Sequence, residues 1–379
     1  MANRLDELEI PRGPGFLSTD ANHNGFRPEG LPQDADGTVS PDSEEPESPG
    51  TLGRRFFRPQ TLISFVIAGF IVLFFFQRLE INYREIWSNI RQANLAIYAL
   101  AFIPFYGSFY LRAFRWRLML ARVGISEENG YPVPKSQGLV EIFLLSWFAN
   151  CILPAKLGDA YRCYLLKRQA KAPFSLSFGT VLAERLLDLT VLFAFMALSA
   201  FVVFGGHLPG QASQTVYIGA GLLALGAVGV LGMWLARDFV QRRLPKRLHE
   251  QYGRLHDGVF ACLRRPWVFI GIGLIIWAGE GLRLWLVARA LGADLDPPTA
   301  LFVALMGSLL TTLPITPAGL GVVEVATIKV LDLVGVDTGM GGSIAVMDRV
   351  IGYWSVIVVG LVLYLLRMRR EFTSSDDTT

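Results

Sequence analysis

The chain has 379 residues, of which 52% are hydrophobic and 18% are charged, and its mean hydropathy is +0.41. Because soluble domains carry roughly 25% charged residues, this composition excludes an ordinary soluble globular protein and indicates one that crosses a membrane several times. The formal net charge of +3 is unevenly distributed: residues 1–53 carry 11 acidic and 3 basic side chains, whereas residues 54–379 carry 21 acidic and 32 basic ones.

The amino-terminal segment, residues 1–53, is rich in Pro, Gly, Ser and acidic residues and poor in aromatic ones. Such a composition cannot bury enough apolar surface to fold, so we expect a disordered acidic tail. The tail is not a signal peptide, because the first apolar run begins only near Thr61 and lacks a small-residue cleavage site. Residues 54–370 are expected to form one transmembrane domain, followed by a short tail at 371–379.

After the amino-terminal segment, six apolar runs are each long enough to span a membrane, which takes about 18 residues or more. These full spans are expected at about 60–77, 94–111, 176–204, 215–236, 267–290 and 344–366. Two further segments, 137–170 and 298–334, are apolar but interrupted by proline and glycine. Interrupted backbone at membrane depth survives only against protein or a wet cavity. We therefore expect an all-α polytopic membrane protein with two re-entrant helical hairpins, which could also be counted as eight spans.

The two interruptions are the strongest pointer to a transport site in the sequence, since paired breaks of this kind mark binding sites in transporters. The residues expected to shape the hairpins are the prolines and glycines at the breaks: Pro154, Gly158, Pro314, Pro317, Gly319 and Gly321. Second arms that begin near Ala155 and Ala318 would present free amides and a positive dipole end at mid-membrane. Such helix ends favour a phosphate or a carboxylate.

Lysine and arginine lie on one side of the expected topology. Basic clusters occur at 54–58, 112–122, 156–171, 237–265 and 367–370, whereas the loops at 205–214, 291–298 and 335–343 have no lysine or arginine. By the positive-inside rule, both termini are cytoplasmic in a plasma (inner) membrane, although the loop at 78–93 carries three arginines on the expected outer side.

The two halves, about 55–205 and about 213–368, resemble each other in sequence. Four short matches recur in the same order at separations of 160 to 168 residues: Pro132-Val-Pro134 with Pro297-Pro298, Leu153-Pro154 with Leu313-Pro314, Arg115-Trp116 with Arg283-Leu-Trp285, and Glu184-Arg185 with Asp348-Arg349. Because each half holds three full spans, an odd number, the second copy is expected to be inverted in the membrane.

Charged side chains within apolar helices cost roughly 2.5–3.5 kcal/mol each, so each needs a partner or a cavity. The expected substrate-binding residues are the polar side chains of the hairpins and mid-spans: Asn150, Lys156, Asp159, Arg162, Glu184, Arg185, Asp188, Glu280, Arg283, Glu324, Asp348 and Arg349. The arginines could bind phosphate and the carboxylates an amine or sugar hydroxyls. The alternative is that these groups are neutral ion pairs that fix helix register, above all Glu280 with Arg283, which lie three residues apart.

Three blocks carry a resemblance to a known family. Asn150-Cys-Ile-Leu-Pro-Ala-Lys156-Leu-Gly-Asp159, followed by Glu184-Arg185-Leu-Leu-Asp188 and by Pro314-Ile-Thr-Pro-Ala-Gly-Leu-Gly-Val-Val-Glu324, resembles the lysylphosphatidylglycerol synthase transmembrane-region family, whose members are flippase-like integral membrane proteins. The resemblance covers about 55–370 and implies a lipid-translocating module with re-entrant hairpins. Lys156 and Asp159 stand where the family usually has Arg and Glu, and the shorter Asp159 carboxylate reaches less far.

The sequence and this resemblance favour a flippase that moves a polar or anionic lipid between leaflets through a central cavity. Candidate lipids are an aminoacylated or glycosylated phospholipid, a polyprenyl-phosphate lipid or a hopanoid, made by a separate lipid-synthesising enzyme. An intramembrane lipid-modifying enzyme, with a divalent metal on Glu184 and Asp188, and a small-solute secondary transporter are the alternatives.

No phosphate-loop motif occurs, and all four histidines lie outside the expected spans. The sequence therefore predicts no enzymatic activity, no catalytic residue, no metal or cofactor and no nucleic-acid partner, and it leaves the oligomeric state open.

Overall fold

The computed structural model describes residues 83–152, 157–205, 210–237, 240, 243, 245–312 and 319–376. The chain divides into two units, Met1–Ser48 and Pro49–Thr379, and everything described belongs to the second. The expected acidic tail and the first expected span, 60–77, lie outside the described residues. The same holds for four expected site residues: Pro154, Lys156, Pro314 and Pro317.

Every regular element in the described ranges is a helix, as the sequence predicts. The first half comprises α3 (Tyr83–Gln92), α4 (Leu95–Arg122), the 3-10 turn η1 (Glu127–Asn129), α5 (Ser136–Ile152), α6 (Gly158–Ala170) and α7 (Phe174–Phe204). The second half comprises α8 (Gly210–Leu235), α10 (Lys246–Leu263), α11 (Trp267–Ala290), α12 (Pro297–Leu310), α13 (Val322–Leu333), α14 (Thr338–Arg349), the π-helix η4 (Val350–Trp354) and α15 (Ser355–Asp376).

Five helical segments in the described ranges are long and apolar enough to cross a membrane. They are Leu95–Asn129, Phe174–Phe204, Val216–Leu235, Trp267–Ala290 and Thr338–Arg369. Each coincides with one of the expected spans after the first, because span length and apolar composition are local properties of the sequence. The last of them joins α14, η4 and α15, and the helix continues to Asp376 rather than ending near 366.

Each of the two interrupted segments forms a pair of short helices, as the prolines and glycines predict. The second arms begin later than expected, at Gly158 instead of Ala155 and at Val322 instead of Ala318. At the first break, the Gly158 amide donates to Asn150 Oδ1 over 2.8 Å. Gly319 and Gly321, at the second break, have φ angles of +72° and +83°, a conformation that glycine adopts without strain.

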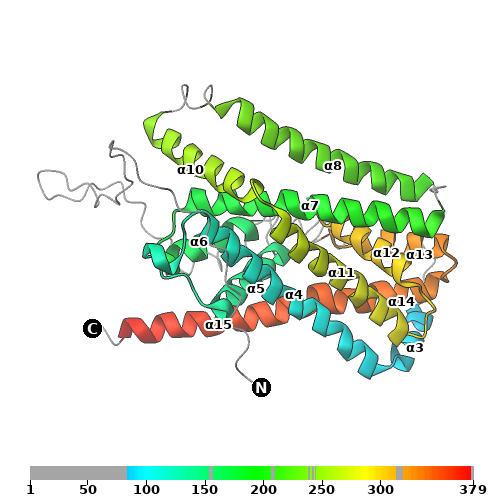
Figure 1. Ribbon diagram of the computed structural model, residues 1–379. Coiled ribbons are helices and arrows are strands. Elements are labelled where there is room, and N and C mark those ends of the chain that lie inside the picture. The colour runs from blue at the N-terminus through cyan, green and yellow to red at the C-terminus, as the bar shows by residue number, and fades with distance from the viewer. Residues whose placement is uncertain are drawn as a thin grey trace, which may run out of the picture. The chain divides into compact units, whose positions relative to one another are not determined.

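The helices of the two halves pack in matching ways. In the first half α4 contacts α5, α5 contacts α6 and α6 contacts α7; in the second, α11 contacts α12, α12 contacts α13 and α13 contacts α14. The halves interlock because α4 lies along α11, α7 packs against α12, and α15 packs against α5. Figure 1 shows α5 and α6 toward one end of α7, and α12 and α13 toward the other end.

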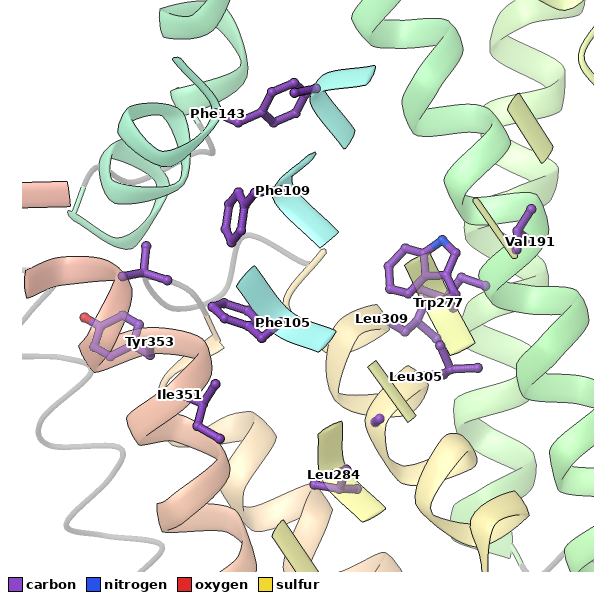
Figure 2. Close-up of a cluster of buried hydrophobic side chains, with 14 of the residues drawn as sticks. Phe105, Phe109, Phe143, Val191, Trp277, Leu284, Leu305, Leu309, Ile351 and Tyr353 are labelled. Atoms are coloured by element: carbon purple, nitrogen blue, oxygen red, sulfur yellow. The ribbon is translucent and has the colours of Figure 1, made fainter. Parts of the chain in front are cut away.

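Apolar side chains from both halves form one large buried cluster at this junction. Figure 2 shows Phe105 and Phe109 of α4, Trp277 and Leu284 of α11, and Tyr353 of η4 within it. Phe105 and Phe109 pack edge to face, with ring centroids 5.5 Å apart. The junction between the halves is therefore a packed core, into which the polar groups described next are inserted.

Candidate functional site

Among the residues that the structure describes, a set of twelve ion-paired charged side chains lies buried or half-buried between the apolar helices, and we refer to it as the buried charge network. They come from α4, α6, α7, α11, α13 and α14: Arg112, Arg115, Asp159, Arg162, Glu184, Arg185, Asp188, Glu280, Arg283, Glu324, Asp348 and Arg349. Six are arginines and six are carboxylates, so the formal charges balance. Charges inside a membrane protein need such compensation, since each is costly to desolvate alone.

Arg115 is the centre of the network in the first half. Its Nη1 donates to Asp188 Oδ1 over 2.7 Å, and its Nη2 donates to Glu184 Oε1 over 2.8 Å and to Asp188 Oδ2 over 3.0 Å. One guanidinium reaches both carboxylates because they lie one helical turn apart on α7. The Arg115 side chain is only 1% exposed, so it neutralises these carboxylates in a setting with almost no contact with solvent.

The hairpin helix α6 connects to this centre through two arginines. Arg162 Nη2 lies 2.8 Å from Glu184 Oε2, and its guanidinium stacks over the rings of Trp116 and Phe143. Arg185 of α7, one residue after Glu184, forms a two-pronged pair with Asp159 of the hairpin helix α6, at 2.8 and 2.6 Å.

The second half contains an equivalent set of ion pairs. Arg283 donates to both carboxylate oxygens of Asp348 over 2.9 and 3.1 Å, and its Nη1 lies 2.8 Å from Glu280 Oε2. Arg349 Nε lies 2.9 Å from Glu324 Oε1. The other oxygen of Glu324 accepts from the Gly321 amide over 2.7 Å, so this carboxylate also caps the start of α13.

The pairs correspond between the halves by position. Arg115 with Glu184 corresponds to Arg283 with Asp348. The hairpin pair of Asp159 with Arg185 corresponds in the same way to the pair of Glu324 with Arg349. Asp188 has no acidic counterpart, because Gly352 occupies the equivalent place, where an added Cβ would lie 3.3 Å from Arg283 Nη1.

One ion pair crosses from α4 to α11 and links the two sets. Arg112 Nη2 lies 3.5 Å from Glu280 Oε1, and the Arg112 guanidinium carbon lies 5.1 and 5.7 Å from the ring centres of Trp147 and Trp277. Sequence reasoning missed Arg112 and Arg115 as site residues, because both were counted with the basic cluster at 112–122. Their spacing of three residues, which places them on one helix face, was the available signal.

Asn150 and Gly158, two further expected site residues, have structural contacts. Asn150 caps α6 through the Gly158 amide. A Cβ at Gly158 would lie 2.0 Å from the Ser146 carbonyl oxygen, so only glycine permits this approach of α5 and α6. The residues described contain no group of three or more side chains suited to a metal ion. Chemically, the network can exchange ion-pair partners or receive an oxyanion, and the ligand roles of its members remain a prediction.

Known proteins with similar sequences include proteins named as membrane proteins and a protein named as a glycosyltransferase. The chain is 30% identical to UPF0104 membrane protein MJ1078 of Methanocaldococcus jannaschii over 58% of this chain and 94% of that protein. It is 24% identical to a UPF0104 membrane protein of Methanothermobacter thermautotrophicus over 73% of this chain and 87% of that protein. It is 26% identical to Glycosyltransferase AglD of Haloferax volcanii over 86% of this chain and 57% of that protein.

The relation to AglD corrects one expectation. The sequence predicts no enzymatic activity, and that prediction is wrong, because a protein named as a glycosyltransferase matches most of the chain. The absence of a phosphate loop and of histidine in the spans was too narrow a criterion. This chain spans only 57% of AglD, so the activity in that name is a property of AglD.

No solved structure matches this chain. The family model described as the lysylphosphatidylglycerol synthase TM region matches residues 61–360, which is most of the chain. The five apolar helices and the two interrupted segments agree with a multi-pass membrane protein of this kind. The chain therefore belongs to the lysylphosphatidylglycerol synthase TM region family.

Proposed function

We propose that this protein moves a polar or anionic lipid between the leaflets of a membrane, through a cavity between its two interrupted helix pairs. The observation that carries the proposal is the buried charge network. It connects a carboxylate in each second arm, Asp159 on α6 and Glu324 on α13, to an arginine of a long helix, Arg185 and Arg349 respectively. A protein that served only as a membrane anchor would have no need for such costly groups.

The physical argument is that a polar headgroup needs replacement partners while it crosses the hydrocarbon. Ion pairs between a hairpin and a long helix can open and offer an arginine to a phosphate or a carboxylate to a hydroxyl or amine. The Arg185 side chain is 39% exposed, so this pair is the part of the network most accessible to a ligand. Water or lipid beside it would lower the cost of separating the charges.

The corresponding ion pairs also support an inverted repeat as part of this proposal. Two copies related by a pseudo-two-fold axis in the membrane plane would place one hairpin toward each side of the bilayer. The two hairpins could then open in turn, each toward its own side of the bilayer, around the shared junction of α4 and α11. The proposed setting is the plasma membrane, with both termini in the cytoplasm, as the distribution of lysine and arginine predicts.

A sidedness assay in proteoliposomes tests the transport proposal. We expect the protein to speed the crossing of at least one labelled lipid among anionic, aminoacylated, glycosylated and polyprenyl-phosphate headgroups. Arg185→Ala and Arg349→Ala should each slow that crossing at least tenfold, because each removes the arginine that pairs with a hairpin carboxylate.

The matched control is Arg289→Ala, which removes an arginine of α11 whose side chain is 50% exposed and pairs with the fully exposed Asp294. It should retain the parent rate. If no headgroup crosses faster than in empty vesicles, lipid translocation is excluded. Uptake of a water-soluble solute without any change in lipid sidedness would instead identify a small-solute transporter.

Cysteine labelling tests the proposed orientation. All three native cysteines are buried, and burial raises the pKa of Cys262 to about 12, so background labelling near neutral pH should be low. Asp294→Cys, in the loop after α11, should react with an impermeant maleimide on intact cells. Glu128→Cys, in η1 between α4 and α5, should react only after permeabilisation. The opposite pattern at both positions would contradict cytoplasmic termini.

Glycosyl transfer is the second candidate function, and the similarity to AglD favours it. The purified protein should be incubated with membrane lipid and a panel of labelled nucleotide-sugar and lipid-linked sugar donors. Transfer of label to an acceptor, lost in Asp188→Asn, would support it. Because the same preparation can be used for the sidedness assay, the two candidates can be separated directly.

A further inference from the structure

In and around the buried charge network, more hydrogen-bond donors than acceptors are without a partner. Among the described side chains of this region, buried N–H groups without a hydrogen-bond acceptor occur on Arg112, Arg115, Arg162 and Trp277. The one buried acceptor oxygen without a hydrogen bond is Glu184 Oε2, which already lies 2.8 Å from Arg162 Nη2. Buried donors without partners are unfavourable and rare in native proteins. The region therefore suits a ligand that supplies acceptor oxygens, not one that supplies an ammonium group.

Two of these unpaired donors, Arg112 Nε and Trp277 Nε1, belong to side chains in direct contact. The Arg112 guanidinium carbon lies 5.7 Å from the centre of the Trp277 ring, and Trp147 flanks the guanidinium at 5.1 Å. Both donor-bearing residues are more than nine-tenths buried, at 3% and 8% exposure. Two indole rings therefore lie near the guanidinium, and its Nε has no hydrogen-bond acceptor.

Arg112 is also the most weakly paired arginine of the network. Its contact with Glu280 is 3.5 Å long and is not a hydrogen bond, whereas Arg115 and Arg283 each reach a carboxylate within 2.9 Å. A loosely held arginine can accept a new anion with the least loss of existing contacts.

We propose that Arg112 and Trp277 bind a phosphate oxyanion where α4 crosses α11, with Arg112 Nε and Trp277 Nε1 donating to its oxygens. The site rests on the proposed function, because it assigns the chemistry of the headgroup that would be moved. It selects a phosphate-bearing lipid over a lipid whose polar group is only an amine or a hydroxyl. Its position at the junction of the halves would let bound phosphate weaken the Arg112–Glu280 pair that links them.

Ligand-dependent thermal unfolding of the full chain in detergent tests the site. A thiol-reactive dye can report unfolding, since the three cysteines are buried in the folded protein. The probes are dihexanoylphosphatidylglycerol, dihexanoylglycerol, which has the same acyl chains without phosphate, and inorganic phosphate. The phospholipid should raise the unfolding temperature in a saturable way, and dihexanoylglycerol should not.

The decisive variants keep the shape of the site and remove single donors. Trp277→Phe keeps an aromatic ring beside Arg112 but lacks the N–H, and Arg112→Lys keeps the charge but lacks Nε. Each should weaken the phospholipid response at least tenfold, the effect expected for one hydrogen bond to a charged group. Trp354→Phe, at an indole that is 55% exposed, is the control and should respond as the parent does.

The outcomes separate the site from the transport proposal. Equal responses of the parent, Trp277→Phe and Arg112→Lys would overturn the site. An equal, Trp277-dependent response to inorganic phosphate would support the oxyanion site and identify free phosphate as a sufficient ligand. If the parent moves lipid and Trp277→Phe moves it equally fast, this inference fails and translocation stands. If phosphate binds through Trp277 but no lipid crosses, translocation fails and the site stands.

Discussion

Replacing Arg115 by methionine should destabilise the protein more than any other single substitution in the buried charge network. Arg115 neutralises both Glu184 and Asp188, and its side chain is 1% exposed. Removing one partner of a buried ion pair typically costs about 3–5 kcal/mol, because the other charge is left without compensation. We expect Arg115→Met to lower the thermal unfolding temperature sharply or to prevent recovery of folded protein.

The control is Arg117→Met, two residues further along α4. Its side chain is 43% exposed and lies 3.4 Å from the exposed Glu127, so its loss should have little effect. The double variant Arg115→Met with Asp188→Leu should recover part of the lost stability, since it removes the unpaired carboxylate as well. If Arg115→Met were as stable as Arg117→Met, the network would not contribute to folding as described.

Gly158→Ala should also destabilise the protein, and its effect should be concentrated in the first hairpin. An added Cβ would lie 2.0 Å from the Ser146 carbonyl oxygen and 2.6 Å from Asn150 Oδ1, so α5 and α6 would have to separate. Overpacking of this kind typically costs about 1–3 kcal/mol. Separation would also displace Asp159, the next residue, from Arg185. We therefore expect both a lower unfolding temperature and loss of lipid crossing in the sidedness assay.

Gly107→Ala on α4 is the matched control, because nothing lies within 4 Å of a Cβ added there. Alanine is favoured over glycine in a helix by about 1 kcal/mol, so this variant should be as stable as the parent or slightly more stable. Both substitutions replace glycine by alanine. If one lowers the stability and the other does not, the difference is caused by the close approach of α5 and α6 at Gly158. A Gly158→Ala protein with parental stability and transport would contradict this packing.

Much of the helical layout could be predicted from the sequence, because each helix depends on its own composition. Five spans follow from continuous apolar runs, and the two interrupted segments follow from closely spaced prolines and glycines, which weaken a helix. Contacts within a helix were predictable too. The pairing of Glu280 with Arg283 and the position of Glu184 and Asp188 on one face of a helix follow from spacings of three and four residues.

The partners between helices were decided only by the tertiary structure. Arg115 and Asp188 are 73 residues apart, and Arg283 and Asp348 are 65 apart, and no local pattern specifies such distant pairs. In the sequence, Arg112 and Arg115 belong to a basic cluster that is typical of the cytoplasmic end of a span. They are nevertheless buried, because α4 continues to Arg122 and lies along α11. A charge near the end of an apolar run is compatible with either water or a buried carboxylate. The helices packed around it determine which of the two it meets.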